Sequence, residues 1–590
     1  MANLFSRSAP NAPVASNPPK RNREGACLST TMAGSFRGLH PVSIEEIERP
    51  GKKRHNGNPA HLGTSKCILL RVSINPKILP MKSPEITSLA RIDRREFIKA
   101  SSLAAGGFVF GAPALLRGQN LNSKLNIACV GIGGKGRSDT DACADENIVA
   151  LCDVDSASEA YEIQTKKYPS AKFYKDFRQM LDQMGNQIDA VTVSTPDHMH
   201  AIVASAAMRR NKAVFCQKPL TQTIYEARYL RKMAKERKLV TQMGNQGSSA
   251  DGFRRAVETI QDGLIGQVHE VHVWTNRPVW PQGMDRPLGE DPVPATLDWD
   301  VWIGPAPMRP YKASRKPYDR YGIYEPFSWR GWQDFGCGAL GDMACHTVNM
   351  PFRALDLEDP TVVEAMPFGR MNKESYPVGS KIRFDFPKRK AHIPAEHPHL
   401  FHHSRKIEHD AVTLWWYDGG QPDPTARGGH DLSNKPPVEL TADIVALRGN
   451  LPDSGCLLVG DGGQVFSPDD YGTNFFVKLK GDQKFLNYTE HPAMAQYPER
   501  IPRNHYGKTG GSSVFTHAQE WLVAVKESKP EICYSRFDIA ARLTEIMLLG
   551  CVSLRAGQKI EWDGPKMVAK NCPQAAQFIR RQNRSGWALS

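Results

Sequence analysis

A glycine-rich loop that follows a short apolar segment constrains the fold of this chain more than any other feature. Residues 125–130 are apolar and of strand length, and the loop after them has the spacing Gly-x-Gly-x-x-Gly. In this pattern the first glycine makes a tight turn, the second lets a pyrophosphate approach the backbone, and the third lets a helix pack against the strand. The loop consists of Gly131, Ile132, Gly133, Gly134, Lys135 and Gly136. It predicts a dinucleotide-binding loop at a helix N-terminus, where backbone amides face the phosphates.

An acidic residue at the end of the next apolar segment indicates which nucleotide binds. Residues 148–152 are apolar and end at Asp153, twenty residues after Gly133. A carboxylate at this spacing accepts hydrogen bonds from ribose hydroxyls and repels a 2′-phosphate. We therefore expect NAD as the cofactor, with NADP less favoured.

Segments of strand and helix character alternate over residues 123–246, which we expect to form one domain. The expected strands are residues 188–194, 213–216 and 239–243, and the expected helices are residues 176–184, 202–210 and 224–237. This alternation predicts an α/β Rossmann domain with a parallel, doubly wound sheet, whose ligands bind at the carboxyl ends of the strands. The candidates at those ends are Thr195, Pro196 and His200 in an expected loop over residues 195–200, and then Gln217, Lys218 and Asn245.

The remainder of the chain, residues 247–590, has a different pattern. Expected strands follow one another with few helices between them, which predicts an α+β domain with a large, mainly antiparallel sheet. The expected strands are residues 268–275, 381–386, 412–417, 456–459 and 475–479, and the expected helices are residues 254–262, 518–525 and 537–549.

An acid and a histidine lie four residues apart in this second domain. If the chain is helical from about residue 340, Asp342 and His346 lie on one face of the helix. The carboxylate is then expected to orient the imidazole and to stabilise its charged form. Glycines at 336, 338 and 341 allow close approach of a nicotinamide. The alternative for this pair is an ordinary contact on a helix surface.

The loop with Asp153, the segment over residues 195–200 and the Lys218-Pro219 pair together resemble the Gfo/Idh/MocA oxidoreductase family, from about residue 125 to the C-terminus. The resemblance implies hydride transfer between a carbinol carbon and NAD on a sugar, cyclitol or glycoside substrate. In that scheme His346 is the acid/base, Lys218 binds the reacting oxygen, and Asp342 fixes His346. The resemblance also implies a homo-oligomer and a second domain that binds substrate. One departure is Gln217, because the family commonly has glutamate there.

Other candidates rest on weaker patterns. Substrate contacts are expected from Asn245, Arg277, Trp280 and Trp332, with packing inside loops as the alternative for the last three. Histidines crowd between residues 392 and 409, but their spacing matches no tight ligand set. We expect a solvated insertion there and no metal site.

The N-terminal region predicts a compartment. Residues 1–90 are rich in Pro, Asn, Ser and Arg without periodicity, which indicates disorder or translation from too early a start. Residues 91–117 combine the paired Arg94 and Arg95, an uncharged stretch and a small-x-small site at residues 112–114. This resembles a bacterial twin-arginine signal and predicts a periplasmic or secreted protein. A membrane-spanning helix is disfavoured because the uncharged stretch, residues 100–116, is short for a span and contains glycine and proline, so no stable insertion is expected after cleavage.

Charge and cysteine usage exclude other classes. The formal net charge is +14, but the first 114 residues carry 17 basic and 7 acidic side chains and so hold +10 of it. The positive charge therefore belongs to the N-terminal region, and no nucleic-acid partner is expected. The twelve cysteines show no metal-like spacing, and we expect buried thiols rather than a disulfide framework.

Three functions compete at this stage. The leading hypothesis is an exported oxidoreductase whose nicotinamide cofactor is tightly bound before export. The first alternative is a glycoside hydrolase that oxidises its sugar transiently and returns the hydride. The second is a non-catalytic relative that only binds the cofactor, against which the presence of Lys218, Asp342 and His346 argues.

Overall fold

The computed structural model describes residues 123–314, 322–392, 406–426, 428–501, 503 and 513–589. The prediction for residues 1–90, both arginines of the expected export signal and most of the crowded histidines lie outside these residues. None of the helices within the described residues is long and apolar enough to cross a membrane. The ten cysteines of this part of the chain are free and buried, as expected of thiols that act as small apolar side chains.

The first sheet has six parallel strands in the order β3-β2-β1-β4-β5-β6. The strands are β1 (Asn126–Val130), β2 (Asn147–Cys152), β3 (Lys172–Tyr174), β4 (Ala190–Val193), β5 (Ala213–Cys216) and β6 (Thr241–Met243). The central strands β1, β4 and β5 are mainly apolar and buried along almost their whole length because helices cover both faces of the sheet. This confirms the predicted Rossmann sheet and adds β3, which is short and partly exposed.

Side chains cap three of the five helices between these strands. The five helices are α2 (Lys135–Ala142), α3 (Glu159–Lys167), α4 (Phe177–Met184), α5 (Asp197–Arg209) and α6 (Ile224–Arg237). Ser158 caps α3, Asp176 caps α4, and Thr223 forms a capping box with Glu226 on α6.

One boundary was predicted wrongly. Residues 197–200 were expected to be loop, whereas α5 already begins at Asp197. Pro196 precedes the helix with φ fixed at −59°, and the acidic Asp197 in the first turn complements the helix dipole. A helix start is therefore favoured at this point, before the apolar periodicity becomes visible.

The second sheet has ten strands in the order β16-β15-β14-β13-β7-β12-β9-β8-β17-β18. Among its pairings β12 and β7 run parallel, and the others are antiparallel, so the predicted mainly antiparallel α+β domain is confirmed. The strands are β7 (Val268–Trp274), β8 (Val362–Phe368), β9 (Gly379–Phe386), β12 (Val412–Asp418), β13 (Gly455–Gly460), β14 (Gly463–Ser467), β15 (Phe476–Leu479), β16 (Leu486–Asn487), β17 (Ile560–Asp563) and β18 (Val568–Ala569). A separate pair joins β10 (Arg389–His392) to β11 (Lys406–His409).

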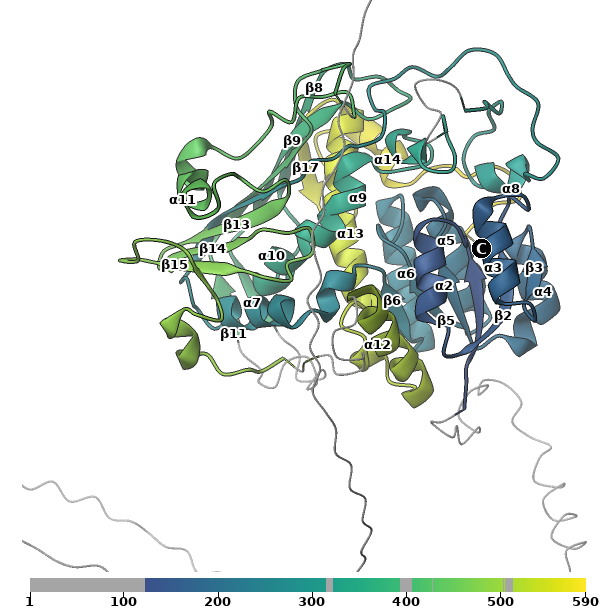
Figure 1. The fold of residues 1–590 in the computed structure, drawn as a ribbon. Helices are drawn as coiled ribbons and strands as arrows, with labels where there is room; N and C mark the ends of the chain where they lie inside the picture. The colour runs from purple at the N-terminus through teal and green to yellow at the C-terminus, as the bar shows by residue number, and fades with distance from the viewer. Residues whose placement is uncertain are drawn as a thin grey trace, which may run out of the picture. The chain divides into compact units, whose positions relative to one another are not determined.

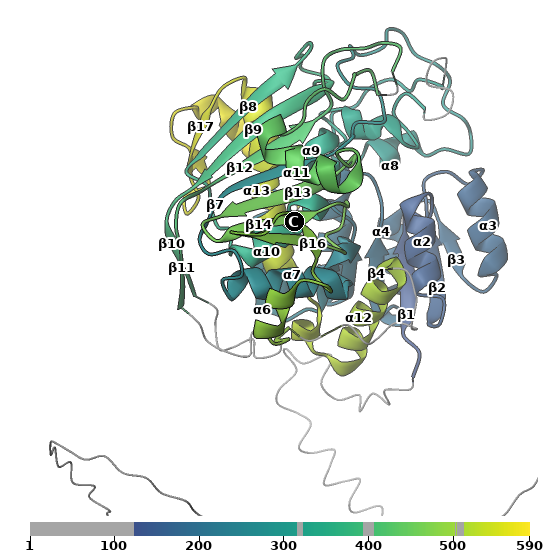
Figure 2. The same cartoon turned by 60° about the vertical axis from the view of Figure 1, so that its left-hand side comes forward.

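A layer of helices lies between the two sheets (Figures 1 and 2). Helix α13 (Phe537–Ala556) packs against α6 on one side and against α9 (Gly338–Thr347) and β8 on the other. The approach is close, since a Cβ on Gly550 of α13 would lie 2.5 Å from the Leu340 side chain. The other helices of this domain are α7 (Asp251–Gln261), α8 (Trp299–Ile303), α10 (Asn349–Ala354), α11 (Val438–Arg448), α12 (Ser513–Glu527) and α14 (Ala576–Ile579).

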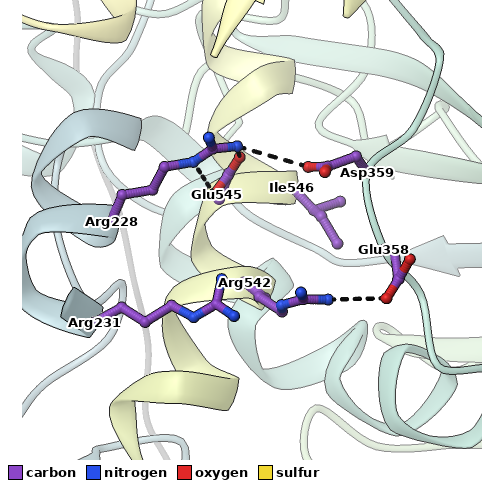
Figure 3. A pocket seen from close by; sticks show the side chains of 7 residues that line it. All are labelled: Arg228, Arg231, Glu358, Asp359, Arg542, Glu545 and Ile546. Carbon is purple, nitrogen blue, oxygen red and sulfur yellow. Dashed lines mark hydrogen bonds and ion pairs between the residues drawn. The ribbon is translucent and has the colours of Figure 1, made fainter. Parts of the chain in front are cut away.

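Charged side chains reinforce the contact between α6 and α13 beside a pocket of about 40 Å³ (Figure 3). The Arg228 guanidinium donates from Nε to Glu545 Oε2 at 2.9 Å, and so joins the Rossmann domain to the long helix of the second domain. Burial raises the pKa of Glu545, although the hydrogen bond from Arg228 opposes this. The two domains are thus locked by helix packing and by ion pairs.

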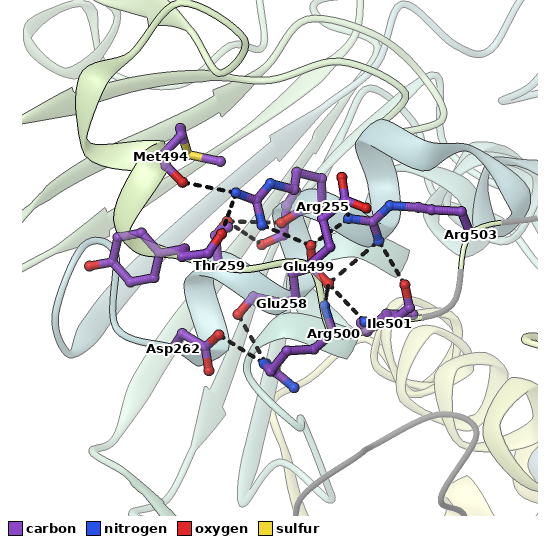
Figure 4. A network of polar contacts seen from close by, with 11 residues as sticks. Arg255, Glu258, Thr259, Asp262, Met494, Glu499, Arg500, Ile501 and Arg503 are labelled. Carbon is purple, nitrogen blue, oxygen red and sulfur yellow. Dashed lines mark hydrogen bonds and ion pairs between the residues drawn. The ribbon is translucent and has the colours of Figure 1, made fainter. Parts of the chain in front are cut away.

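A buried glutamate holds a second segment in place (Figure 4). Glu258 on α7 is fully buried and accepts hydrogen bonds from the backbone amides of Arg500 and Ile501, each at 2.8 Å. Its carboxylate also accepts hydrogen bonds from Arg255 at 2.9 Å and from Arg503 at 2.5 Å. Glu258 therefore fixes a stretch of irregular chain to the helix that precedes β7.

Candidate active site

The glycine loop forms a cradle that has no room for a side chain at Gly131 or Gly136. Gly131 has a φ of +76°, and a Cβ there would lie 2.7 Å from the carbonyl oxygen of Ser194. A Cβ on Gly136 would lie 1.8 Å from the carbonyl oxygen of Gly131, so α2 begins in direct contact with the turn. Around Gly134, by contrast, nothing lies within 4 Å of such a Cβ. The loop is therefore closed toward the sheet and open on its outer side, as a pyrophosphate requires.

Asp153 is anchored to this loop. Its Oδ2 accepts a hydrogen bond from the backbone amide of Ile132 at 2.9 Å, and burial raises its pKa despite that bond. Two further carboxyl groups, those of Asp155 and Glu325, lie near enough to interact with it electrostatically. Burial and these two aspartates raise the pKa of Glu325 to about 7. The region that would receive the ribose is thus acidic, which disfavours a 2′-phosphate.

Two predicted cofactor ligands, Gln217 and Lys135, instead bind the buried side chain of Asp139. Asp139 on α2 accepts hydrogen bonds from Gln217 Nε2 and from Ser194 Oγ, both at 2.8 Å, and it also pairs with Lys135. The amide at position 217 therefore donates to a carboxylate, which a glutamate at the same position would repel. Gln217 Oε1 and Thr195 Oγ1 are buried and have no hydrogen-bond partner among the residues that the structure describes, so both could bind a ligand.

His200 joins two loops and does not face an open site. Its Nδ1 lies 2.7 Å from the carbonyl oxygen of Pro219, and its Nε2 lies 2.8 Å from that of Thr195. The imidazole is 1% exposed, and burial lowers its pKa to about 4. His200 thus sets the position of Thr195 and of the Lys218-Pro219 turn, whereas a direct role in cofactor binding has no geometric support. Pro196 lies at the N-cap of α5.

Lys218 and Asp342 form the centre of the candidate site. The Lys218 ammonium donates to the carboxylate Oδ1 of Asp342 at 2.9 Å and to its main-chain oxygen at 2.8 Å. The Nε of Arg330 donates to the same Oδ1 at 3.1 Å. Burial alone would raise the pKa of Asp342, but the charges of Lys218 and Arg330 hold it well below its ordinary value. Asp342 is therefore a permanent anion that keeps the ammonium group in place.

His346 lies one helical turn after Asp342 on α9, and its imidazole is 5% exposed. Its Nδ1 is buried and has no hydrogen-bond partner within the described part of the chain. Burial, followed by the charge of Lys218, lowers the pKa of His346 well below its ordinary value, although Asp342 opposes this. The Asp342 carboxylate binds Lys218 and Arg330 rather than orienting the imidazole. Its charge favours the charged form of His346, as expected, but burial and Lys218 outweigh it and the imidazole stays neutral.

The weaker substrate candidates separate into two groups. Trp280 and Trp332 are each 1% exposed, and their indole nitrogens donate to Gln282 Oε1 at 3.0 Å and to the carbonyl oxygen of Ile323 at 2.8 Å. Neither presents a face to a sugar, so the packing alternative is correct for both. Arg277 remains a candidate, since its charge acts on both Asp342 and His346.

Asn245 is 1% exposed, and both ends of its amide are engaged within the protein. Its Nδ2 donates to the carbonyl oxygen of Cys345 at 3.4 Å, and its Oδ1 accepts from Ser535 Oγ at 2.5 Å. It therefore supports the position of α9 rather than a substrate.

Three residues of the site were not predicted from the sequence. Arg330 binds Asp342, and Tyr471 packs against His346 with ring centroids 4.9 Å apart and planes at 85°. Asp197 is 4% exposed, and burial raises its pKa to about 7 against the charges of Lys218 and Arg330. The Asp in the segment over residues 195–200 was a visible signal for Asp197, whereas nothing in the local sequence singles out Tyr471.

Two family models match this chain. The model of the Gfo/Idh/MocA oxidoreductase family, NAD-binding Rossmann fold, matches residues 125–245. The model of the oxidoreductase family C-terminal alpha/beta domain matches residues 259–366. The two matches therefore include the glycine loop and Lys218 in one domain and Asp342 and His346 in the other.

Individual relatives match over part of their length. Inositol 2-dehydrogenase of Salmonella typhimurium is 31% identical over 153 residues, which is 25% of this chain and 45% of the relative. A glycosyl hydrolase family 109 protein of Stenotrophomonas maltophilia is 33% identical over 137 residues, which is 21% of this chain and 29% of the relative. The chain thus spans less than half the length of these curated relatives.

The chain can also be aligned with a solved structure. It is described as an inositol dehydrogenase homolog complexed with NADH and myo-inositol, from Azotobacter vinelandii. The alignment covers 75% of this chain and 98% of that chain, with 14% identity and a TM-score of 0.46.

Proposed function

Since residues 125–245 and 259–366 belong to the Gfo/Idh/MocA oxidoreductase family, we propose that this protein oxidises a hydroxyl group of a sugar or cyclitol with NAD. The observation that carries the proposal is the Lys218–Asp342 ion pair, with His346 one turn further along α9. These groups come from both domains and meet beside the Rossmann loop. A lone ion pair would serve stability, but a neutral, unpartnered imidazole next to it is suited to proton transfer.

The fit of the cofactor rests on the loop and on unpartnered polar atoms. The glycines of residues 131–136 leave the outer side of the loop open, and Thr195 Oγ1 is buried without a protein partner. Asp153 would hold the adenosine ribose, and the acidic surroundings favour NAD over NADP. The bound nicotinamide supplies a hydride acceptor, which no side chain provides.

The side chains would then align the substrate and take its proton. Lys218 donates a hydrogen bond to the reacting hydroxyl oxygen and stabilises negative charge as it develops there. Asp342 keeps Lys218 charged and correctly placed, and Arg330 supports Asp342 from the other side. His346, which is neutral, accepts the hydroxyl proton. The unpartnered Oδ1 of Asp470 is a further acceptor for a hydroxyl of a polyol substrate.

A second candidate function is favoured by one relative. The chain is 33% identical over 137 residues to a protein named as a glycosyl hydrolase of family 109. A hydrolase that oxidises its sugar transiently would need the same lysine and histidine and the same cofactor. It would release an aglycone and regenerate NAD within one cycle.

A single assay separates these two candidates. The purified protein is incubated with NAD and a panel of free sugars, cyclitols and aryl glycosides, and both NADH absorbance and aglycone release are followed. We expect net NADH formation, or exchange between an aldose and a ketose when the nucleotide stays bound. Aglycone release without net NADH would overturn the oxidoreductase in favour of the hydrolase, and turnover unchanged in Lys218→Ala would overturn the assignment of the site.

We further propose that the protein is exported in folded form with its cofactor bound. The support is sequence alone: Arg94 and Arg95 before an uncharged stretch. Conversion of both arginines to lysine should leave the protein in the cytoplasm of a twin-arginine-competent host, measured by fractionation. Equal periplasmic amounts of the variant and the natural chain would contradict this proposal.

A further inference from the structure

The loop between β14 and β15 is held in a fixed conformation beside the candidate site. The carboxylate of Asp469 accepts hydrogen bonds from the amide of Tyr471 at 2.7 Å and from the amide and hydroxyl of Thr473 at 3.2 and 2.9 Å. An aspartate that collects several loop donors in this way stabilises one turn conformation. The position of the Tyr471 backbone is thus set from within the loop.

Glycines seat the same loop against the end of the Rossmann domain. A Cβ on Gly247 would lie 2.3 Å from the carbonyl oxygen of Tyr471, and one on Gly252 would lie 2.0 Å from that of Thr473. Both contacts are between backbones, and any side chain at either glycine would force the loop away. The loop is therefore fixed to Gly247, shortly after β6, and to Gly252 in the first turn of α7.

The side chain of Tyr471 reaches the imidazole of His346. Their ring centroids are 4.9 Å apart and the planes meet at 85°, which is an edge-to-face contact. The carboxylate of Asp342, the nearest acidic group on α9, binds Lys218 and Arg330. The Nδ1 of His346 has no hydrogen-bond partner among the described residues. The contact with the Tyr471 ring is therefore the described contact that defines the plane of the imidazole.

We propose that Tyr471 is the positioning residue of His346, and that it fixes the plane of the imidazole through its aromatic ring rather than through its hydroxyl. The consequence for catalysis rests on the oxidoreductase function proposed above. A proton acceptor must point its free nitrogen at the substrate hydroxyl. Since Nδ1 of His346 has no hydrogen-bond partner among the described residues, the imidazole needs steric confinement to do so. Asp470 and Arg277, 3.5 Å apart, border Tyr471 and are the next candidates for contact with substrate.

The test compares two substitutions at one position. Tyr471→Phe keeps the ring and Tyr471→Leu removes it, with Tyr471→Met as a second ring-free variant if the leucine protein does not fold. Tyr488→Leu is the matched control, because Tyr488 stacks on Phe475 at 4.4 Å and lies on the far side of β15 in sequence. Each full-length protein is labelled with ¹³Cε1-histidine, and the His346 signal is assigned from its loss in His346→Gln.

In Tyr471→Leu we expect the His346 resonance to shift and its titration to change, with a kcat about 10- to 100-fold lower and an unaltered KM for NAD. Tyr471→Phe and Tyr488→Leu should both resemble the natural protein in all of these measurements. An unchanged His346 resonance and titration in the ring-free variant would overturn the proposal, whatever happens to kcat.

The His346 spectra can be recorded without any enzymatic turnover. They therefore test the role of Tyr471 independently of the proposed oxidoreductase function. A shifted His346 resonance in a protein that oxidises no substrate would sustain the positioning role and reject the oxidoreductase. Normal turnover together with an unchanged His346 resonance in Tyr471→Leu would support the oxidoreductase and reject the positioning role.

Discussion

Lys218 is bound twice by the same residue, through the main-chain oxygen and through the carboxylate of Asp342. The lysine lies at the end of β5 and the aspartate on α9, so the ammonium group is fixed relative to both domains. Its side chain is 14% exposed, and only a partner of opposite charge makes such burial of an ammonium favourable. This arrangement has two consequences that can be measured at single residues.

Replacement of Lys218 by methionine removes the ammonium but keeps most of the side-chain volume. We expect kcat to fall by about 100-fold or more, because one charged donor to the developing alkoxide is lost. Steady-state kinetics on the substrate found in the assay above measures this. Lys312→Met is the matched control: Lys312 is also buried and pairs with Asp291 at 3.2 Å, so its loss should lower Tm but leave kcat within about threefold. Equal losses of kcat in both variants would indicate a general effect of removing a buried lysine.

The neutral imidazole of His346 predicts an unusual pH profile. Burial and the charge of Lys218 depress its pKa, so the base form persists as the pH falls through 6.5, and it is lost only well below that value. The acid limb of kcat/KM should therefore lie well below pH 6.5. Because the pKa of Asp197 is raised to about 7 by burial, the profile is measured in Asp197→Asn as well. A limb near pH 6.5 that persists in this variant would contradict the depressed pKa of His346.

At the scale of elements, local patterns predict the main helices and strands of both domains but miss several others, among them α3, α10 and β14. Helix α6 and strand β5 have the bounds that periodicity predicts. Strand β8 was not predicted, because only Val363 is fully buried in it and alternation is weak. Helix α5 begins earlier than expected, since Pro196 and Asp197 favour a helix start that apolar periodicity does not reveal. The local signals therefore fix most elements but miss those whose burial comes from a distant neighbour.

Glu258 allows a test of how one element fixes another. In Glu258→Gln, Arg255 and Arg503 lose their buried counter-charge, and we expect the free energy of unfolding to fall by about 3 kcal/mol. Hydrogen bonds from Arg503 and from the backbone outweigh burial and lower the pKa of Glu258 in the folded protein. The ionised carboxylate therefore stabilises the fold fully above the ordinary pKa of 4.5, and this stabilisation is lost as pH falls through the pKa of the folded state. Urea denaturation at pH 7 and pH 4 measures both effects.

The control for Glu258 is an exposed ion pair. Glu527→Gln, which breaks the surface pair with Lys529 at 2.9 Å, should change stability by less than about 1 kcal/mol. A similar loss in the two variants would show that the buried network contributes no more than a surface contact.

At the scale of the whole molecule, the candidate site exists only because two domains meet. The glycine loop and Lys218 belong to one sheet, whereas Asp342, His346 and Tyr471 belong to the other domain. Helix α13 packs between the sheets, and Arg228 joins α6 to Glu545 on it. A nucleotide bound at this junction would contact both domains and should stabilise the chain as a unit.

Nucleotide binding should accordingly raise the thermal stability of the whole chain. At 100 times its Kd, NADH should add about 2.7 kcal/mol to the free energy of unfolding and give a single, higher Tm. NADPH should shift Tm much less, because the carboxylates of Asp153 and Asp155 repel its 2′-phosphate, and Glu325, whose pKa is raised to about 7, adds to this repulsion as it ionises. Differential scanning fluorimetry measures both shifts, and in Asp153→Ser the difference between the two nucleotides should shrink. Equal shifts with NADH and NADPH in the natural chain would contradict the predicted preference.

The sequence by itself determined the dinucleotide loop, the spacing to Asp153, the class of each domain, and the placement of Asp342 and His346 one turn apart. These features follow from backbone sterics and from the periods of helices and strands, which operate over a few residues. The tertiary structure alone decided what the side chains do. Asp342 binds Lys218, which is 124 residues away, instead of the nearby imidazole.

The same limit explains the residues that were misjudged or missed. The sequences around Trp280 and Trp332 are compatible with a sugar site, but packing buries both indoles. Tyr471 reaches His346 only because Gly247 and Gly252 admit its loop. Burial and charge pairing are properties of the assembled core, so no local pattern encodes them, and they decide which of the predicted residues face the chemistry.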